Sequence, residues 1–146
     1  MTTGEKTKVL FVCVHNIARS QMAEALLNSL AGERFKAESA GLSSGVLNPL
    51  VVEVMREAGI DISANQSKSV FDFANQGRVF DYVVTLCDEA NAERCPVFPG
   101  ATKRLRWNFA DPSALTGGRE EKLEALRRIR DEIRQSLLGF LNETPA

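Results

Sequence analysis

The fold of this chain is decided by the stretch KVLFVCVHNIARS, which runs from Lys8 to Ser20. Its first part, residues 8–14, is nearly all apolar and rich in β-branched side chains, without the alternation of a half-exposed strand. A continuous apolar run of this kind is typical of a strand that is buried on both faces of a parallel sheet. The stretch therefore predicts a central strand that ends in a loop with polar side chains.

Helix and strand signals alternate along the rest of the chain. Apolar residues recur at helical spacing in three segments, which predict helices over residues 20–32, 49–58 and 119–141. Further short segments predict strands over residues 35–40, 80–86 and 103–109. Such alternation builds βαβ units with right-handed crossovers. We therefore expect an α/β fold, a three-layer sandwich with a four-stranded parallel sheet of the flavodoxin-like type.

The size and charge of the chain limit what it can bind. It has 146 residues, 44% of them hydrophobic and 25% charged, which predicts one globular domain over residues 1–146. Its 18 basic and 19 acidic residues leave a formal charge of −1, so we expect no nucleic acid and no membrane as partners. The N-terminus is polar and the chain has three cysteines. We therefore expect a protein of the reducing cytoplasm. We also expect it to be a monomer.

The loop after the central strand has the composition of an oxyanion site. Five residues separate Cys13 from Arg19, so the backbone N–H groups of the loop can point inward, toward a tetrahedral anion at the start of the next helix. The Arg19 guanidinium can hold two oxygens of that anion, and the positive field favours the thiolate form of Cys13. Ser20 can donate a hydrogen bond to the sulfur, and Asn16 can brace the loop. The predicted anion-binding loop consists of Val14, His15, Asn16, Ile17, Ala18, Arg19 and Ser20.

Other interpretations of this loop have less support. A cysteine at the end of a strand is often a small buried apolar residue, but an arginine six residues later favours the oxyanion site. The glycine-rich run and the lysine of a Walker phosphate loop are absent from the sequence. A zinc-binding module would use Cys13, His15, Cys87 and Cys95 as ligands, and the charge of Arg19 would oppose the metal. The last alternative is an oxyanion-binding domain without catalytic activity.

The loop and several later motifs resemble one enzyme family. The motif Cys13-x5-Arg19-Ser20, followed by QMAEA, is similar to that of the low-molecular-weight protein tyrosine phosphatases and, more narrowly, of the bacterial arsenate reductases that share their fold. The similarity continues in order through ESAG (38–41), GIDIS (59–63), VVTLCD (83–88) and DP (111–112), so it covers residues 8–141. His15 stands where relatives often carry glycine, and Ala18 where many carry cysteine. We expect His15 to shape the loop or its entrance, because histidine tolerates unusual backbone angles better than most residues.

The resemblance implies a mechanism that starts at Cys13. Cys13 attacks the central atom of an oxyanion while Asp111 donates a proton to the departing oxygen. If the anion is arsenate, with phosphate and sulfate as competing anions, Cys87 then attacks Cys13, arsenite leaves and a Cys13–Cys87 disulfide forms. Cys95 next attacks Cys87, and thioredoxin reduces the resulting Cys87–Cys95 disulfide. Seven residues separate Cys87 from Cys95, one more than the family spacing. A disulfide needs Cα atoms within about 4.4–6.8 Å of each other, which a rigid helix between the two cysteines could not provide, so we expect this segment to rearrange during turnover.

A hydrolytic enzyme of the same family is the main alternative. A low-molecular-weight protein tyrosine phosphatase needs only Cys13, because water completes its reaction. Such phosphatases tend to carry aromatic residues just after the Asp-Pro pair, where this chain has the stretch SALTGG (113–118), and its only tyrosine, Tyr82, lies in a predicted strand. A small inorganic oxyanion needs no aromatic wall. The sequence therefore favours arsenate reduction, with thioredoxin as the reductant.

The resemblance also covers a potassium site that some relatives have beside the catalytic loop. Asn16, Glu24 and Ser39 match parts of that site, but Lys68 stands where those relatives carry an acidic ligand. We expect the Lys68 ammonium group to replace the ion and to pair with Glu24; the alternative is a solvated lysine. The sequence therefore predicts no metal ligands and no tightly bound cofactor, and potassium is possible but not expected.

Overall fold

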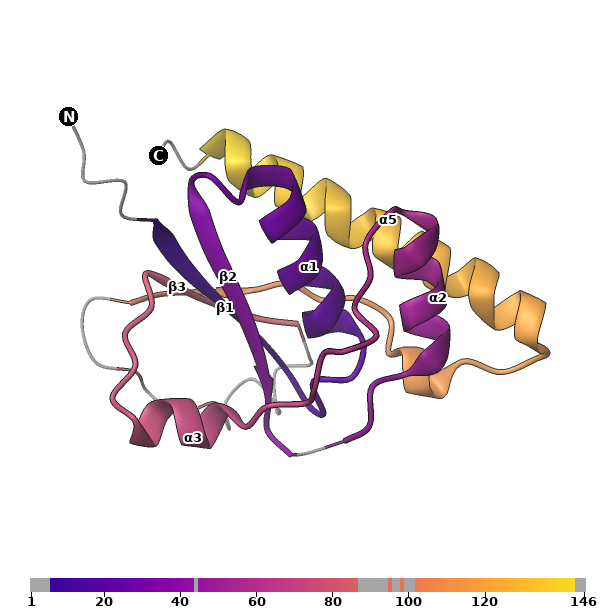
Figure 1. Ribbon diagram of the computed structural model, residues 1–146, viewed down its shortest axis with the longest axis horizontal. Coiled ribbons are helices and arrows are strands. Elements are labelled where there is room, and N and C mark those ends of the chain that lie inside the picture. The colour runs from indigo at the N-terminus through magenta and orange to yellow at the C-terminus, as the bar shows by residue number, and fades with distance from the viewer. Residues whose placement is uncertain (1–5, 44, 87–94, 96–97, 99–101, 144–146) are drawn as a thin grey trace.

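One parallel sheet forms the centre of the protein. The structure, a computed structural model, describes residues 6–43, 45–86, 95, 98 and 102–143 (Figure 1). Within these residues the strands are β1 (Thr7–Cys13), β2 (Phe35–Gly41), β3 (Tyr82–Thr85) and β4 (Lys103–Arg106). All of their pairings are parallel, in the order β2-β1-β3-β4. This arrangement confirms the predicted α/β fold with a four-stranded parallel sheet.

The strand β1 lies inside the sheet, as its apolar sequence predicts. Residues Val9–Val12 have 0% exposed surface, because β2 and β3 flank the strand and helices cover both of its faces. The chain adds β2 on one side of β1 and then crosses over to add β3 and β4 on the other side, so the direction of winding reverses between β1 and β3. In open parallel sheets ligands bind at such a point, just beyond the carboxyl ends of the strands. The segment that follows Cys13 therefore starts at the position where this fold binds its ligands.

The three predicted helices are present, and a fourth that the sequence analysis did not predict joins them. In the described part of the chain the helices are α1 (Arg19–Ala31), α2 (Pro49–Glu57), α3 (Val70–Asn75) and α5 (Arg119–Glu143), and a 3-10 turn covers Pro112–Ala114. The helix α3 has only six residues, too few to show a helical period in the sequence. The strands β3 and β4 are also shorter than the predicted ranges. Among the described residues, no helix combines the length and the apolar character needed to cross a membrane.

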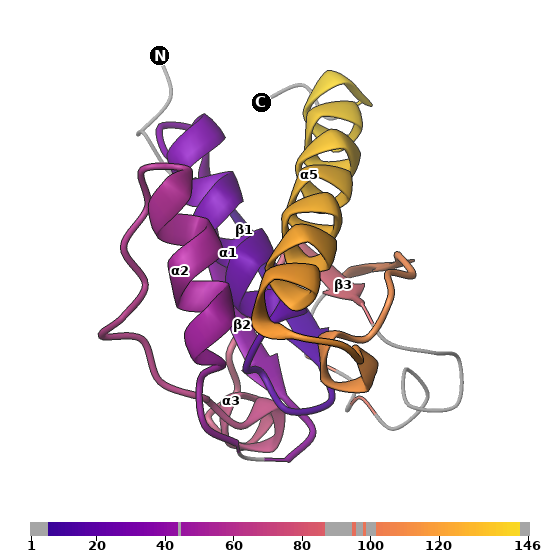
Figure 2. The same ribbon diagram turned by 90° about the vertical axis from the view of Figure 1, so that its right-hand side faces the viewer.

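The side chains of β1 alternate between two apolar clusters, one on each face of the sheet. Phe11 and Cys13 belong to the cluster that also contains residues of α1, α2 and α5. Leu10 and Val12 belong to the second cluster, which contains residues of α3 together with Cys95. Figure 1 shows α1, α2 and α5 on one side of the sheet and α3 on the other, and Figure 2 shows α5 standing beside α1 and α2. This is the expected three-layer sandwich.

An ion pair joins α2 and α5 in the helical layer. Arg127 of α5 donates two hydrogen bonds to the carboxylate of Glu57, at 2.8 Å and 2.9 Å. These hydrogen bonds lower the pKa of Glu57 and raise that of Arg127. Both side chains are more than one third exposed, so the pair contributes little to the free energy of unfolding. Its effect is to fix how α5 lies against α2.

Candidate active site

The loop between β1 and α1 curls around the sulfur of Cys13. The backbone N–H of Asn16 donates a hydrogen bond to Cys13 Sγ at 3.2 Å, and the Ser20 hydroxyl lies 2.8 Å from the same atom. Cys13 has only 3% of its surface exposed. Hydrogen bonds to a sulfur favour its thiolate form. The loop thus points the N–H of Asn16 inward and places the Ser20 hydroxyl beside the sulfur.

A left-handed residue gives the loop its shape. Asn16 has a φ of 55°, and among the described non-glycine residues it alone has a positive φ. This conformation turns the Asn16 N–H toward the sulfur. The sequence analysis considered His15 for the unusual backbone angle, but in the structure Asn16, the next residue, has this angle. Asparagine is one of the residues that adopt this region most readily, because its short polar side chain can hydrogen-bond locally.

His15 lies at the entrance of the site. Its side chain is exposed, and its Nδ1 atom is 2.8 Å from the hydroxyl of Ser43. Its carbonyl accepts a hydrogen bond from the hydroxyl of Ser67, also at 2.8 Å. The two serines therefore tie the segments after β2 and before α3 to the rim of the catalytic loop.

The guanidinium of Arg19 is held by backbone carbonyls at the carboxyl edge of the sheet. Its Nη1 atom donates to the carbonyl of Leu86 at 3.0 Å and to that of Phe109 at 3.2 Å. Its Nη2 atom lies 3.9 Å from a carboxylate oxygen of Asp111. Only 8% of Arg19 is exposed. A buried arginine with fixed carbonyl partners presents its remaining N–H groups in one direction, which suits the binding of an oxyanion.

These residues surround a small cavity of about 240 Å³. The cavity is lined by Cys13, Val14, His15, Ile17, Ala18, Arg19, Asn48, Asp111 and Pro112. Asp111 has 52% of its side chain exposed, so its carboxyl group can exchange protons with solvent. The cavity is smaller than the usual sites for drug-sized ligands, and its size suits a small anion. The structure thus brings Cys13, the loop and Asp111 together around one cavity.

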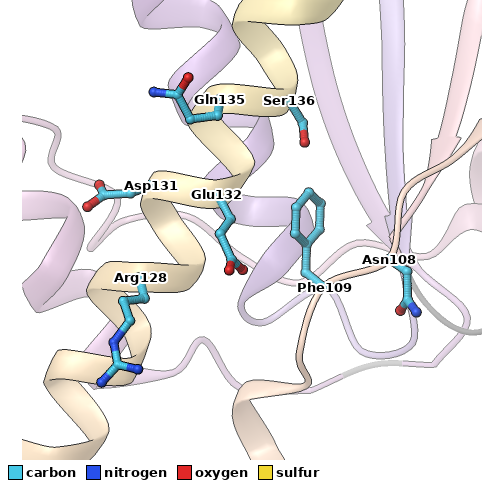
Figure 3. A pocket seen from close by; sticks show the side chains of 7 residues that line it. All are labelled: Asn108, Phe109, Arg128, Asp131, Glu132, Gln135 and Ser136. Carbon is cyan, nitrogen blue, oxygen red and sulfur yellow. The ribbon is translucent and has the colours of Figure 1, made fainter.

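A larger hollow of about 550 Å³ lies beside the site, between α5 and the segment after β4. Figure 3 shows the ring of Phe109 standing in this hollow beside Glu132 of α5. The hollow contains no residue that the sequence analysis predicts for catalysis. Phe109 nevertheless connects the hollow to the catalytic cavity, because its carbonyl accepts a hydrogen bond from Arg19 while its ring lines the hollow.

A second group of charged and polar residues lies behind the loop. The Lys68 ammonium group contacts a carboxylate oxygen of Glu24 at 2.9 Å, and the Ser39 hydroxyl donates to the same oxygen at 2.8 Å. The backbone N–H of Lys68 donates to the side-chain oxygen of Asn16 at 2.9 Å. The four residues that the sequence analysis assigns to this region therefore form one connected network.

Cys13 and Cys95, the two cysteines that the structure describes, lie in different apolar clusters. Cys95 is 5% exposed and packs in the cluster on the α3 side of the sheet, opposite to the cluster that contains Cys13. Cys87 lies outside the described residues. Because Cys13 and Cys95 lie on opposite faces, the arrangement does not favour a zinc site that shares them. The described residues contain no cluster of histidine, cysteine or acidic side chains that could hold a metal ion.

Several polar residues near the site were not predicted. Gln21, fully buried, donates to the carbonyl and to the side-chain oxygen of Asn16, and Asn65 donates to Gln21. A signal for Gln21 was present in the sequence, because it is a polar residue on the buried start of a helix. No local pattern could have identified Asn65, Ser43 or Ser67, which reach the loop from distant segments.

The fold and the site define a class of protein. A cysteine that accepts a hydrogen bond from a loop N–H, with a buried arginine six residues later at the carboxyl edge of a parallel sheet, is the arrangement of an enzyme that attacks an oxyanion through sulfur.

Comparison with known proteins identifies the family. The chain belongs to the low molecular weight phosphotyrosine protein phosphatase family, whose pattern matches residues 8–145. The arsenate reductase of Bacillus subtilis (strain 168) is 42% identical over 136 residues, which are 93% of this chain and 96% of the relative. A solved arsenate reductase in the phosphate binding state superimposes with a TM-score of 0.76 at 27% identity, over 95% of this chain and 99% of that one. A thioredoxin-dependent arsenate reductase from Corynebacterium glutamicum gives a TM-score of 0.69 at 31% identity, over 98% of this chain and 66% of that one.

Proposed function

We propose that this protein is a single-domain arsenate reductase, that it reduces arsenate to arsenite through Cys13, and that thioredoxin returns it to the reduced form. The observation that carries this proposal is the arrangement around Cys13 Sγ, where the Asn16 N–H and the Ser20 hydroxyl contact the sulfur and the buried Arg19 lies at the rim. We call this arrangement the cradle. The cradle suits a tetrahedral oxyanion, and the names of the relatives select arsenate among such anions. Phosphate and sulfate are also tetrahedral oxyanions, so they are expected to compete.

The first step joins sulfur to arsenic. The Cys13 thiolate attacks the arsenic atom, an S–As bond forms, and one arsenate oxygen leaves as water after taking up protons. Arg19 holds the remaining oxygens and offsets their charge. Asp111, which lines the cavity and faces Arg19, supplies a proton to the departing oxygen.

The second step transfers two electrons to arsenic. Cys87 attacks the Cys13 sulfur, the S–As bond breaks, and its electron pair stays on arsenic, which leaves as arsenite while a Cys13–Cys87 disulfide forms. The position of Leu86 supports this role for Cys87. Leu86 is the preceding residue in the sequence, and its carbonyl binds Arg19 at the edge of the cavity.

The third step carries the oxidation away from the cavity. Cys95 attacks Cys87, which releases the Cys13 thiolate and forms a Cys87–Cys95 disulfide that thioredoxin reduces by thiol–disulfide exchange. Cys95 is buried on the opposite face of the sheet. We therefore infer that it leaves its apolar cluster once Cys13 and Cys87 have joined.

Two parallel assays test the proposed function. With thioredoxin, its reductase and NADPH, the purified protein is expected to form arsenite from arsenate over many turnovers. With an aryl phosphate in place of arsenate, we expect little phosphate release. After the Asp-Pro pair, where phosphatases of this family tend to carry aromatic residues, this chain has none. The ring of its only tyrosine, Tyr82, packs against Phe140 inside the protein. Dominant phosphate release without arsenite formation would replace the reductase with a phosphatase.

Replacing Asp111 with asparagine is expected to slow arsenite formation by about a hundredfold or more, because a general acid contributes at least this factor. The affinity for arsenate is expected to change little, since Arg19 and the loop N–H groups remain. Single-turnover rates and calorimetric binding measure the two effects separately. Asp61→Asn is the matched control, because Asp61 is exposed and does not line the cavity. An unchanged single-turnover rate in Asp111→Asn would remove this residue as the acid.

The ammonium group of Lys68 takes the place of a potassium ion in this proposal. It contacts Glu24, whose side chain is only 15% exposed, and breaking such a pair leaves a poorly solvated carboxylate. The melting temperature of the protein is therefore expected to be equal in potassium and sodium chloride. Lys68→Asp is expected to melt several degrees lower in sodium chloride, about 4 °C for each kcal/mol lost, and to recover part of this loss in potassium chloride. Strong stabilisation of the unaltered protein by potassium would contradict the proposal.

A further inference from the structure

Gln21 is the most fully bonded polar side chain near the catalytic loop. It lies in the first turn of α1 and has 0% exposed surface. Its Nε2 atom donates to the carbonyl of Asn16 at 3.2 Å, to the side-chain oxygen of Asn16 at 3.2 Å and to the carbonyl of Gln66 at 3.0 Å. Its Oε1 atom accepts a hydrogen bond from Asn65 at 3.1 Å. The mechanism described above gives this residue no part.

The contacts of Gln21 fix the orientation of the Asn16 amide. The side-chain oxygen of Asn16 faces two donors, the Gln21 amide and the backbone N–H of Lys68. The side-chain nitrogen of Asn16 must therefore point the other way, toward the Ser20 hydroxyl at 2.7 Å. Because that nitrogen can only donate, the Ser20 oxygen accepts from it. The hydroxyl proton of Ser20 is then directed to Cys13 Sγ, which is 2.8 Å away.

Gln21 also holds the backbone of Asn16. Its hydrogen bond to the Asn16 carbonyl satisfies a buried acceptor in the residue that has the left-handed conformation. Such a conformation costs free energy for a residue other than glycine and persists only where its surroundings enforce it. The Asn16 N–H reaches the sulfur through this conformation. One side chain thus controls both hydrogen bonds that the sulfur receives.

We propose that Gln21 is a positioning residue that holds Asn16 in its left-handed conformation and thereby aims the Asn16 N–H and the Ser20 hydroxyl at the sulfur of Cys13. Asn65 helps to orient the Gln21 amide, because its side chain donates a hydrogen bond to Gln21 Oε1. The effect concerns the thiolate of Cys13 before any substrate binds. It therefore holds for any reaction that starts at this sulfur, and its test does not depend on arsenate reduction.

The test measures how the alkylation of Cys13 depends on pH. Cys87 and Cys95 are replaced with serine so that iodoacetamide reacts only at Cys13, and the rate is followed by mass spectrometry from pH 4 to pH 10. In this background Gln21→Met keeps a side chain of similar length and loses all four hydrogen bonds. The midpoint of its profile is expected to rise by about one pH unit, because weakened hydrogen bonds to an ionised group disfavour the ion. Below the midpoint the alkylation rate is then about tenfold lower.

The matched control lies two turns further along the same helix. Asn28 also bridges α1 to another segment, with hydrogen bonds to the N–H and the carbonyl of Ala37 in β2. Asn28→Leu is expected to leave the midpoint of the profile unchanged, even if the protein melts at a lower temperature. A merely structural role of Gln21 would make the two variants behave alike.

A second variant keeps the proposal testable if Gln21→Met does not fold. Asn65→Ala removes only the hydrogen bond to Gln21 Oε1 and leaves the catalytic loop and Gln21 in place. Its midpoint is expected to rise in the same direction by a smaller amount. A folded Gln21→Met with an unchanged midpoint would overturn the proposal, and so would an unchanged midpoint in Asn65→Ala if the first variant does not fold.

Discussion

Replacing Cys13 with serine is expected to abolish arsenate reduction, with a rate at least about a thousandfold lower, while the protein stays folded and still binds the anion. A serine hydroxyl does not ionise near neutral pH, so it offers no thiolate to attack arsenic. It also cannot form the disulfide through which arsenic receives its electrons. The backbone N–H groups of the loop and the Arg19 guanidinium are unchanged by the substitution, so the cradle persists.

Binding and turnover must be measured together to test this expectation. Arsenite formation is followed with the complete thioredoxin system, and anion binding is followed by the rise in melting temperature that phosphate causes. A variant that binds phosphate normally and forms no arsenite places the loss in the chemical step. Turnover near the original rate in Cys13→Ser would show that another group attacks the anion. Lost binding would show instead that the sulfur holds the cradle in shape.

The sheet was predictable because its central strand has an unambiguous sequence. Residues 8–14 read as a strand buried on both faces, and the described structure places β1 between β2 and β3 with no exposed surface from Val9 to Val12. The long stripe of apolar residues in α5 was equally clear. The helix α3 was missed because two buried residues, Val70 and Phe73, cannot display a period in six positions.

The catalytic loop was predictable in composition but not in conformation. Spacing alone placed Cys13 and Arg19 around one anion, and the structure brings them to the same cavity. The left-handed residue could not be read from the sequence, because it depends on contacts that Asn16 makes with Gln21 and Lys68. Long-range hydrogen bonds of this kind have no local signature, so only the folded chain reveals them.

The position of Cys95 could not be predicted either, and it determines how the relay has to work. The sequence places Cys95 only eight residues after Cys87, which makes the two thiols close along the chain whatever the fold. The structure adds that Cys95 packs with Phe80 and Phe98 on the face of the sheet away from Cys13. Its thiol is thus separated from the cavity by the sheet in the described structure. Such an arrangement keeps the third cysteine out of the first two steps.

Replacing Cys95 with serine is therefore expected to limit the protein to a single turnover with thioredoxin. The first two steps need only Cys13 and Cys87, so one equivalent of arsenite forms per protein molecule. The reaction then stops with a Cys13–Cys87 disulfide, because no third thiol carries the oxidation to a place that thioredoxin can reach. Arsenite stoichiometry and mass-spectrometric mapping of the disulfide measure this outcome.

Cys95→Ala separates the redox role of this residue from its role in packing. Serine places a hydroxyl in an apolar cluster and is expected to cost about 1–2 kcal/mol of stability, whereas alanine keeps the site apolar. If both variants stop after one arsenite and hold the same disulfide, loss of the thiol and not loss of packing is the cause. Continued turnover of either variant with thioredoxin would mean that thioredoxin reaches the Cys13–Cys87 disulfide directly. Cys95 would then be a buried residue of the second cluster with no part in the relay.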